Sequence, residues 1–463
     1  MQVWVGVENF AKIESAKICV DNYTILVGEN NSGKTFLMQL VQGISKKLAY
    51  LVDETIMENL LENEDRAFRK YIINSENISV LVEHINSKLI LEKESIVKEI
   101  FGKEIPIEKL YVDILIEDDI SYSLLMLDSS MEIDTENKDS YHKELEKIAV
   151  DFIVGKLNKG IVCMVGAENA KGEVLKPISL HGSIRNDEFG IFKNALNAII
   201  GCDSLFLPAS RTGLLLLYRE YFANKKDDEI SFTIKNDKVI KNEENSANLT
   251  RPVYEFLRFL QTYTESEEIR KRYNKELLFF EEHLIEGHIN VNKQEGFSYS
   301  SRNENDRVPM YLASSMINEV APLVLSITSQ NAYDRLIIDE VEASLHPQKQ
   351  LELVRFFNRL NNKGMKLIIS THSDTFVSKL NNLYVLSEMV KKNGEDILKQ
   401  FNLEKEDLIS TDNLFVYEVV NKENGKSIVK EIKGDRKAGY QFDLFAHSAI
   451  HIYEEAVKLG EIK

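Results

Sequence analysis

Apolar and polar residues alternate along the chain in two rhythms, one typical of strands and one typical of helices. VWVGVENF and YTILVG have the β-rich composition of strands, and FLMQLVQGISKKLAYLV then carries apolar residues at helical spacing. The same succession returns later, where the strands RLIIDE and KLIIST follow the helical pattern SSMINEVAPLVLSI. Strands that alternate with helices in this way predict an α/β fold with a largely parallel sheet, to which both ends of the chain contribute.

A long insertion separates the two halves of this predicted sheet. Residues 53–103 are strongly charged with helical spacing, and KLYVDILIEDDISYSLLMLD alternates like a pair of strands. YHKELEKIAVDFIVGKL predicts a helix before the strand GIVCMVGA, and the polar run NKKDDEISFTIKNDKVIKNEENSAN predicts a loop. VYEFLRFLQTY and EEIRKRYNKELLFFEEHLI predict two long helices, a hairpin or stalk whose heptads are too irregular for a firm coiled coil. Hairpin strands follow from Gly287 onward.

Composition narrows the class of protein without naming an activity. The chain has 463 residues, longer than one compact core usually grows, and 43% of them are hydrophobic, as in ordinary soluble proteins. The net charge of −17 argues against a surface that coats nucleic acid, although a local basic site stays compatible with it. No apolar run has the length of a membrane span, and the N-terminus lacks the pattern of an export signal. We therefore expect a cytoplasmic protein with no membrane partner, whose three cysteines are buried and reduced.

One short segment fits a phosphate-binding loop in full. It matches G-x-x-x-x-G-K-[ST] after a strand and before a helix, and consists of Gly28, Glu29, Asn30, Asn31, Ser32, Gly33, Lys34 and Thr35. The glycines allow backbone N–H groups to wrap a phosphate, and the N-terminus of the helix favours an anion. Lys34 is expected to reach the β- and γ-phosphates of ATP, and the Thr35 hydroxyl is expected to ligate Mg²⁺. The sequence therefore predicts a site for ATP and Mg²⁺.

Two further strands end in side chains that complete such a site. The strand RLII is followed by Asp339, which is expected to hold Mg²⁺, and by Glu340, which is expected to orient or deprotonate the attacking water. The strand KLIIST is followed by His372, which is expected to approach the γ-phosphate. Lys34, Glu340 and His372 are thus the predicted catalytic residues of an ATPase.

Lys34 and Asp339 lie more than 300 positions apart, so a large module must be inserted into the nucleotide-binding domain. After EN-F-x-K-I near the start, the segments GENNSGKT, LPASRTG, ASSMINEVAPL, LIIDEVEASLHP and IISTHSD occur in this order. Together they resemble an OLD-type or AAA-15 ATPase, an ABC-like group found in prokaryotic antiphage systems such as PARIS and Septu. Glu342 and His346 match the turn that follows the paired acids in this group. The motifs touch both ends of the chain and little of residues 50–200.

The resemblance implies an ABC-type P-loop ATPase head with a mixed or parallel sheet, split by the insertion with its helical hairpin. Residues 1–50 are expected to form the N-terminal half of the head, and residues 51–225 continue it with helical and β insertions. Residues 226–286 hold the polar loop and the hairpin or stalk. Residues 287–463 form the C-terminal half, with a signature-like loop, the paired acids and the switch histidine.

The resemblance also points to residues that a second subunit would contribute. The ABC signature loop is expected at the segment ASSM, where Ser314 would contact the γ-phosphate across a dimer. Met316 replaces the usual glycine of that loop, which predicts a loose nucleotide sandwich or slow hydrolysis. Arg211 has two interpretations of equal weight: a contact with phosphate or with the partner subunit, and a structural cap of the strand-turn.

The chain lacks the residues of a nuclease. OLD nucleases carry a TOPRIM domain, which needs a glutamate after a strand and an Asp-x-Asp pair to bind two metals. Glu418 follows a strand pattern, but no Asp-x-Asp occurs after it. We therefore expect an ATP-hydrolysing sensor or scaffold subunit, a head-to-head dimer or higher homo-oligomer. It would control a separate effector nuclease of the TOPRIM or HNH type and respond to a phage trigger protein.

Two other functions stay open. One is an SMC-like or recombination-repair-like ATPase whose ATP-driven dimer clamps DNA, with the insertion as a stalk. The net charge of −17 counts against it. The other is a nucleotide-gated structural oligomer with little turnover, which Met316 keeps open.

Overall fold

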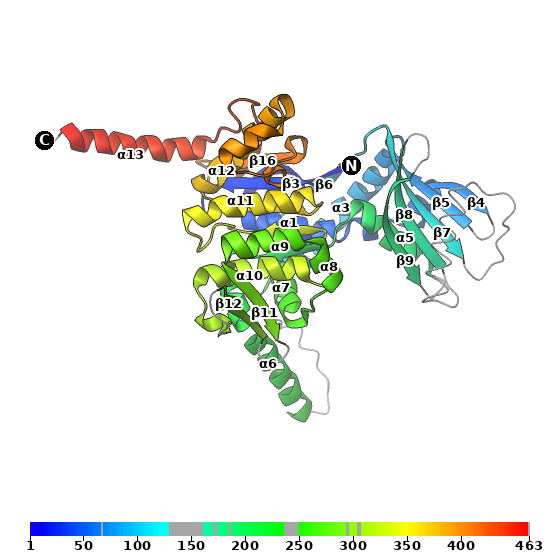
Figure 1. Cartoon of the computed structure of the whole chain (residues 1–463). Helices are drawn as coiled ribbons and strands as arrows, with labels where there is room; N and C mark the ends of the chain where they lie inside the picture. The colour runs from blue at the N-terminus through cyan, green and yellow to red at the C-terminus, as the bar shows by residue number, and fades with distance from the viewer. Residues whose placement is uncertain are drawn as a thin grey trace. The chain divides into compact units, whose positions relative to one another are not determined.

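The computed structural model describes residues 1–65, 68–128, 161–169, 174–183, 187–235, 249–292, 296–302 and 307–461 (Figure 1). The chain divides into two compact units, each made of segments that are discontinuous in sequence. Unit 1 consists of Met1–Val7, Gly43–Ile96 and Ile107–Asp203, and unit 2 consists of Glu8–Gln42, Val97–Pro106 and Ser204–Lys463. The four continuous segments proposed from the sequence stay a prediction.

The strands of unit 2 form a mixed sheet that is largely parallel, as the sequence predicts. In their hydrogen-bonding order they are β10 (Ser204–Leu207), β14 (Arg335–Ile338), β15 (Lys366–Thr371), β3 (Tyr23–Gly28), β16 (Leu414–Asn421), β17 (Ser427–Ile432) and β2 (Ile13–Cys19). All neighbours in this order pair in the parallel direction except β16 and β17. β3, β10 and β14 are buried along their whole length, as expected of parallel strands covered on both faces.

Helices surround this sheet and share its apolar core. Those of unit 2, with α1 crossing its boundary, are α1 (Lys34–Ser45), α6 (Arg211–Lys235), α7 (Arg251–Thr262), α8 (Glu267–Arg272), α9 (Asn274–Phe279), α10 (Ser315–Thr328), α11 (Pro347–Asn362), α12 (Asp374–Asn393) and α13 (Asp443–Glu461). α11 packs against β15 and α12, α7 against β10, and α10 against α6. The predicted hairpin is present as β11 (Gly287–Asn292) and β12 (Gly296–Ser301), with β13 (Val308–Pro309) beside it.

Short turns complete unit 2. Phe280–Leu284 is a π-helical turn, and the 3₁₀ turns are Met310–Leu312, Glu395–Phe401, Lys405–Asp407 and Thr411–Asn413. One continuous cluster of buried apolar side chains reaches from β3 and β14 to α7, α10, α11 and α12. This core fixes the strands whose ends carry the predicted site.

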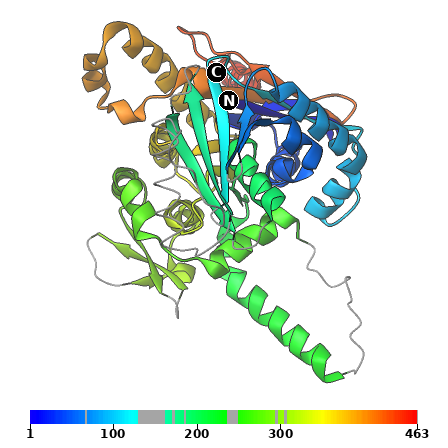
Figure 2. The ribbon, with the colours of Figure 1, turned by 90° about the vertical axis from the view of Figure 1, so that its right-hand side faces the viewer.

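Unit 1 is built around an antiparallel sheet. Its order is β4 (Leu61–Asp65), β5 (Phe68–Ile73), β7 (Ile120–Asp128), β8 (Ile161–Asn169) and β9 (Val174–Ser183), and these strands lie side by side in Figure 2. α5 (Glu188–Ile200) packs against β8 and β9. The other elements are β1 (Gln2–Phe10), hydrogen-bonded to β6 (Lys109–Leu115), a 3₁₀ turn at Leu48–Leu51, α2 (Glu54–Asn59) and α3 (Ile78–Phe101). The boundary of unit 1 falls within β1 and within α3.

Two predictions for the middle of the chain are wrong. Residues 53–103 are not helical throughout, because β4 and β5 lie between α2 and α3. Tyr71 and Ile73 are buried in the sheet, where pairing of β5 with the distant β7 outweighs the local helical spacing. The two strands predicted from KLYVDILIEDDISYSLLMLD exist as β6 and β7, but they do not pair with each other. β6 neighbours β1, whereas β7 lies between β5 and β8.

The two long helices predicted as a hairpin or stalk pack into the core instead. The first is α7, and the second is broken into α8, α9 and the π-helical turn. The break falls at Tyr273, whose side chain is buried, as are those of Leu277 and Phe280. α8 contacts α10 and α9 contacts α11, so these apolar residues face the core of unit 2 rather than a partner helix.

The first part of the polar run predicted as a loop is helical. Residues 224–235 continue α6 as a helix, since they contain no glycine or proline to end it. The rest of the predicted loop, residues 236–248, lies outside the described residues, and so does the helix predicted at 141–157. In the described part of the chain, no helix combines the length and apolar character needed to cross a bilayer.

Candidate nucleotide-binding site

Three of the predicted motifs meet at one edge of the sheet in unit 2. β14, β15 and β3 are neighbours and run parallel, with Ile338 opposite Ile369 and Thr371 opposite Val27. Since parallel strands end at the same edge, the residues that follow these three strands are brought together. They are the phosphate loop, the pair Asp339–Glu340, and His372. The tertiary structure therefore joins the two halves of the site.

The loop between β3 and α1 requires its glycines for two different reasons. Asn31 and Gly33 have φ angles of 57° and 97°, in the left-handed region that glycine tolerates best. A Cβ atom at Gly28 would lie 2.7 Å from the carbonyl oxygen of Val419 on the neighbouring strand β16. Gly28 is therefore required by packing and Gly33 by backbone conformation. α1 starts directly after the loop, so the free N–H groups of its first turn favour an anion there.

Lys34 lies buried at the start of α1, and its ammonium group is held by the loop. Nζ donates to the carbonyl oxygens of Gly28 (3.0 Å) and Glu29 (2.7 Å) and to Oγ of Ser32 (3.1 Å). Burial lowers the pKa of Lys34 to about 8, and nearby carboxylates partly oppose this effect. A buried ammonium group stabilised mainly by neutral oxygens gains from an anionic ligand such as a phosphate.

Thr35 and Asp339 link the two halves of the site directly. The Thr35 hydroxyl donates to Oδ2 of Asp339 over 2.7 Å. Oδ1 of the same carboxylate accepts from Oγ of Ser370 over 2.5 Å. Asp339 is buried and both its oxygens are bonded, so its carboxylate has a fixed orientation toward the loop.

Glu340 has an unusual backbone conformation and a partly exposed side chain. Its φ angle of 47° is rare for a non-glycine residue, and its N–H donates to Oγ of Ser370 over 2.9 Å. The side chain is 44% exposed, and its Oε1 lies 3.8 Å from Nε2 of His372. The carboxylate is thus accessible from solvent and close to the histidine.

Glu342 fixes the start of the segment that carries His372. Its carboxylate accepts from Oγ1 of Thr371 over 2.8 Å and from the backbone N–H of His372 over 2.5 Å. The sequence pointed to Glu342 only through its match to a known turn, and it gave Ser370 no role. A signal for Ser370 was available, because Ser370 and Thr371 are hydroxyl residues that follow the apolar residues of the strand KLIIST.

Ser314, which the resemblance assigns to a signature-like loop, lies at the N-terminus of α10. Its side chain is exposed and accepts from the N–H of Ile317 over 3.3 Å, which caps the helix. Tyr311 and Leu312, just before it, are exposed to 73% and 67%. Met316 instead packs partly against the apolar core.

Arg211 is buried, and its guanidinium group faces other parts of unit 2. It is 1% exposed at the start of α6, and its guanidinium group donates to the carbonyl oxygens of Pro208 (3.2 Å), Asp339 (2.7 Å) and Glu340 (3.2 Å). The predicted contact of Arg211 with phosphate is therefore corrected, because its donors are occupied inside the protein. The structural interpretation fits, and the arginine also secures the turn that bears the paired acids.

The partner of this arginine was not predicted from the sequence. Nη2 of Arg211 forms an ion pair of 2.6 Å with Oε1 of Glu319 on α10, and Nε donates to the Glu319 carbonyl oxygen over 3.0 Å. Burial raises the pKa of the Glu319 carboxyl, although Arg211 opposes the shift. An acid inside the apolar run MINEVAPLVL was the available signal, because a buried carboxylate needs a buried cation or donors.

The donor set suits ATP with Mg²⁺. Magnesium is usually bound through one or two carboxylates together with phosphate oxygens and waters. Thr35 and Asp339 provide a hydroxyl and a carboxylate at one place, and Lys34 with the N-terminus of α1 provides donors for phosphate. The residues present therefore fit both groups.

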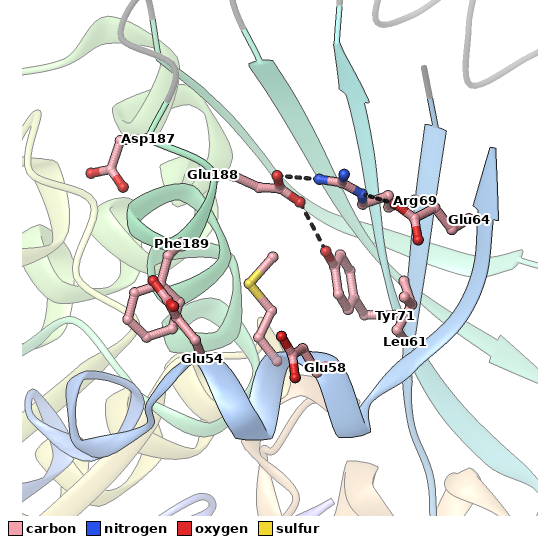
Figure 3. Close-up of a pocket in the computed structure, with 10 residues that line it drawn as sticks. Glu54, Glu58, Leu61, Glu64, Arg69, Tyr71, Asp187, Glu188 and Phe189 are labelled. Atoms are coloured by element: carbon pink, nitrogen blue, oxygen red, sulfur yellow. Dashed lines mark hydrogen bonds and ion pairs between the residues drawn. The ribbon is translucent and has the colours of Figure 1, made fainter. Parts of the chain in front are cut away.

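A separate cavity of about 470 Å³ lies in unit 1, between α2, β5 and the start of α5 (Figure 3). Among the described residues that line it, half are acidic and Arg69 is the one basic residue. Arg69 is paired with Glu188 and with Glu64, and Glu188 also accepts from the Tyr71 hydroxyl over 3.0 Å. The cavity contains none of the predicted site residues.

Several solved structures resemble the chain loosely. The head of an SMC protein bound to the C-terminal winged-helix domain of ScpA has 11% identity and a TM-score of 0.36, and the match covers 93% of this chain and 97% of that chain. The SMC head domain from Thermotoga maritima has 11% identity and a TM-score of 0.33, with 94% and 100% covered. An Smc head from Pyrococcus furiosus has 11% identity and a TM-score of 0.32, with 98% of both covered. Such low scores support no inference about function.

Comparison with protein families gives a firmer result. No curated protein matches the chain. The family AAA_15, described as an AAA ATPase domain, matches residues 3–377. This range covers most of the chain and includes the phosphate loop, Asp339, Glu340 and His372. The chain therefore belongs to the AAA_15 family of AAA ATPase domains.

Proposed function

We propose that the chain binds ATP with Mg²⁺ and hydrolyses it, and that it does so as a subunit of an antiphage defence complex. The observation that carries the ATPase proposal is the hydrogen bond between Thr35 and Asp339. It unites a phosphate loop with a strand-end acid from the other end of the domain, in the arrangement that nucleotide hydrolysis needs. The membership in an ATPase family supports the same conclusion.

The phosphate loop binds the nucleotide. The ammonium group of Lys34 exchanges its bonds to loop carbonyl oxygens for bonds to phosphate oxygens, and its charge favours the bound anion. Thr35 and Asp339 would hold Mg²⁺, which neutralises charge on the phosphates. Because Ser370 and Thr35 already orient the Asp339 carboxylate, this acid needs little reorganisation on binding.

Glu340 acts on the attacking water. Its carboxylate accepts the water's proton as the water adds to the γ-phosphorus atom, and the bond to the β-phosphate oxygen breaks, which yields ADP and phosphate. His372, 3.8 Å from this carboxylate, orients it and the γ-phosphate. Glu342 supports the histidine through its backbone N–H.

A second copy of the chain completes the site. Ser314 is exposed at the N-terminus of α10, where a hydroxyl and free N–H groups favour an anion, so it would contact the γ-phosphate bound to the opposite subunit. The exposed side chains of Tyr311 and Leu312 would be covered in the same contact. ATP then shifts the chain toward the dimer, because only the dimer offers it both sets of contacts.

The resemblance to antiphage ATPases supports the biological role. The chain would act as the sensor or scaffold that restrains a separate effector nuclease of the TOPRIM or HNH type. A phage trigger protein would change the assembly and release or activate that nuclease. The likeness to the PARIS and Septu systems supports the effector's class.

The test combines turnover, mass and phage resistance. Wild type, Lys34→Ala and Glu340→Gln are compared for ATP hydrolysis, for mass with and without ATP, and for protection of cells that carry the gene together with its native neighbouring genes. We expect both variants to lose turnover and Lys34→Ala to lose protection. Turnover that survives Glu340→Gln would overturn the role of this residue. Turnover stimulated by duplex DNA, with salt-dependent binding, would favour the DNA-clamping alternative instead.

A further inference from the structure

A buried ion pair joins the signature-like helix to the turn that carries Glu340. Arg211 and Glu319 are each almost fully buried, and Oε2 of Glu319 also accepts from the hydroxyl of Thr212. Neither side chain lies on the surface, and neither is among the groups that hold ATP. Their burial therefore calls for a role inside the protein.

The guanidinium group of Arg211 touches three segments of unit 2 at once. Nη1 donates to the carbonyl oxygen of Pro208, directly after β10. On α10, Nε donates to the backbone carbonyl oxygen of Glu319, and Nη2 forms an ion pair with its carboxylate. Nη1 and Nη2 also donate to the carbonyl oxygens of Asp339 and Glu340. A buried charge is stable only while such partners stay in place, so the three segments are tied to one another.

The backbone of Glu340 depends on this contact. Its N–H is held by Ser370 and its carbonyl by Arg211, so side chains fix both ends of a residue with a φ angle of 47°. A non-glycine residue in this region is strained and keeps its conformation only while its surroundings enforce it. Loss of the Arg211 bond would let the peptide relax and would move the carboxylate.

We propose that Arg211 and Glu319 are positioning residues that transmit the position of α10 to the carboxylate of Glu340. α10 begins directly after Ser314, and Glu319 lies on the same helix. When a second subunit engages Ser314, a small shift of α10 moves Glu319, and through Arg211 it moves the backbone of Glu340. Hydrolysis is thereby coupled to dimer formation. This step rests on the proposed function.

The pair is suited to this task because its geometry leaves little freedom. Charge-assisted hydrogen bonds are short and directional, and a guanidinium group holds its donors in one plane. A displacement of about 1 Å in a catalytic group is enough to cost up to about 100-fold in rate. Small movements of α10 therefore suffice to switch Glu340 between productive and unproductive positions.

Five variants, one of them a control, test the proposal. Glu319→Gln keeps the shape of the side chain but removes its charge, and Thr212→Val removes only one hydrogen bond to Glu319. Asp407→Asn is the matched control. Asp407 is also fully buried, and it is paired with two arginines of α11, away from the site. Each is measured for nucleotide affinity, kcat, and amide hydrogen exchange of residues 336–345.

We expect Glu319→Gln to lower kcat about tenfold or more while the Kd for ATP stays within about twofold. Hydrogen exchange at residues 336–345 should become about tenfold faster in this variant and change less in Thr212→Val. Asp407→Asn should leave kcat, Kd and this exchange unchanged, even where it lowers overall stability. The kcat of Arg211→Lys should lie between that of Arg211→Gln and that of wild type.

The outcomes separate this inference from the proposed function. If wild type hydrolyses ATP and Glu319→Gln has the same kcat, the inference is overturned and the ATPase proposal stands. If wild type binds ATP without turnover, hydrogen exchange alone decides: unchanged exchange at 336–345 in Glu319→Gln overturns the coupling. If Glu319→Gln does not fold, Thr212→Val provides the same comparison. Equal losses in Glu319→Gln and Asp407→Asn also reject the proposal.

Discussion

The hydroxyl of Thr35 donates a hydrogen bond of 2.7 Å to Asp339, which lies 304 positions further along the chain. One partner starts the helix after the phosphate loop, and the other ends a strand beyond a long insertion. The contact exists because β3 and β14 both pair with β15 in the parallel direction. It defines the place where magnesium and phosphate would be held together.

Replacement of Asp339 tests the magnesium site. Asp339→Asn keeps the size of the side chain but removes its charge, so the Mg²⁺ concentration for half-maximal turnover should rise about 10–100-fold. Titration of Mg²⁺ at fixed ATP measures this. Asp412→Asn, a change at an exposed acid, is the control and should have no effect. An unchanged Mg²⁺ requirement in Asp339→Asn would contradict the assignment.

The affinity for ATP should depend on pH through Lys34. Burial lowers the pKa of this amine to about 8 in the free protein, whereas bound phosphate would raise it. Below pH 8 the amine is charged in both states, so affinity is constant there. Above pH 8 binding must take up a proton, and the Kd for ATP should rise about tenfold per pH unit. Calorimetry in buffers of different ionisation enthalpy measures the proton uptake. A Kd for ATP that does not change up to pH 9.5 would disprove this role of Lys34.

Glu340→Gln should separate binding from hydrolysis. The amide cannot accept the proton of water, so kcat should fall about 100-fold or more while ATP still binds. Since hydrolysis no longer opens the dimer, the ATP-bound dimer should persist in light scattering. Lys34→Ala should instead lose both binding and the dimer, with Lys392→Ala as an exposed control. A Glu340→Gln protein that loses ATP binding as well would point to a structural defect.

Ser314→Ala should weaken the dimer more than it weakens the fold. The serine caps α10, so its loss should cost about 1 kcal/mol of unfolding free energy. Ser266 caps α8 in the same manner, and Ser266→Ala should cost a similar amount. Only Ser314→Ala should lower the ATP-dependent dimer in sedimentation. Equal dimerisation of the two variants would remove Ser314 from the proposed interface.

Two glycines should respond in opposite ways to alanine. A Cβ at Gly28 would meet a carbonyl oxygen at 2.7 Å, so Gly28→Ala should destabilise the fold by about 1–3 kcal/mol. Gly213 lies in α6 with free space around it, so Gly213→Ala should stabilise the protein by about 0.5–1 kcal/mol. Urea unfolding of both variants gives the comparison. A neutral Gly28→Ala would show that β3 and β16 adjust to the added atom.

The candidate site was largely predictable because its chemistry is carried by local motifs. The loop from Gly28 to Thr35, the acids after RLII and the histidine after KLIIST each follow a buried strand. A parallel α/β sheet brings such strand ends together without further information. The supporting residue Ser370 and the buried pair Arg211–Glu319 were not predicted, because their function lies in contacts with distant segments.

The sequence by itself determined the three strands YTILVG, RLII and KLIIST and the residues after them that are predicted to bear the phosphate chemistry, since apolar periodicity and motif spacing are local properties. Only the tertiary structure decided that β5 is a strand, that the helix breaks at Tyr273 and that Arg211 faces inward. In each case the deciding energy comes from burial or pairing against a segment far away in the chain. A buried arginine or a strand edge forms its hydrogen bonds with neighbours in space. Local sequence patterns do not reveal which residues those neighbours are.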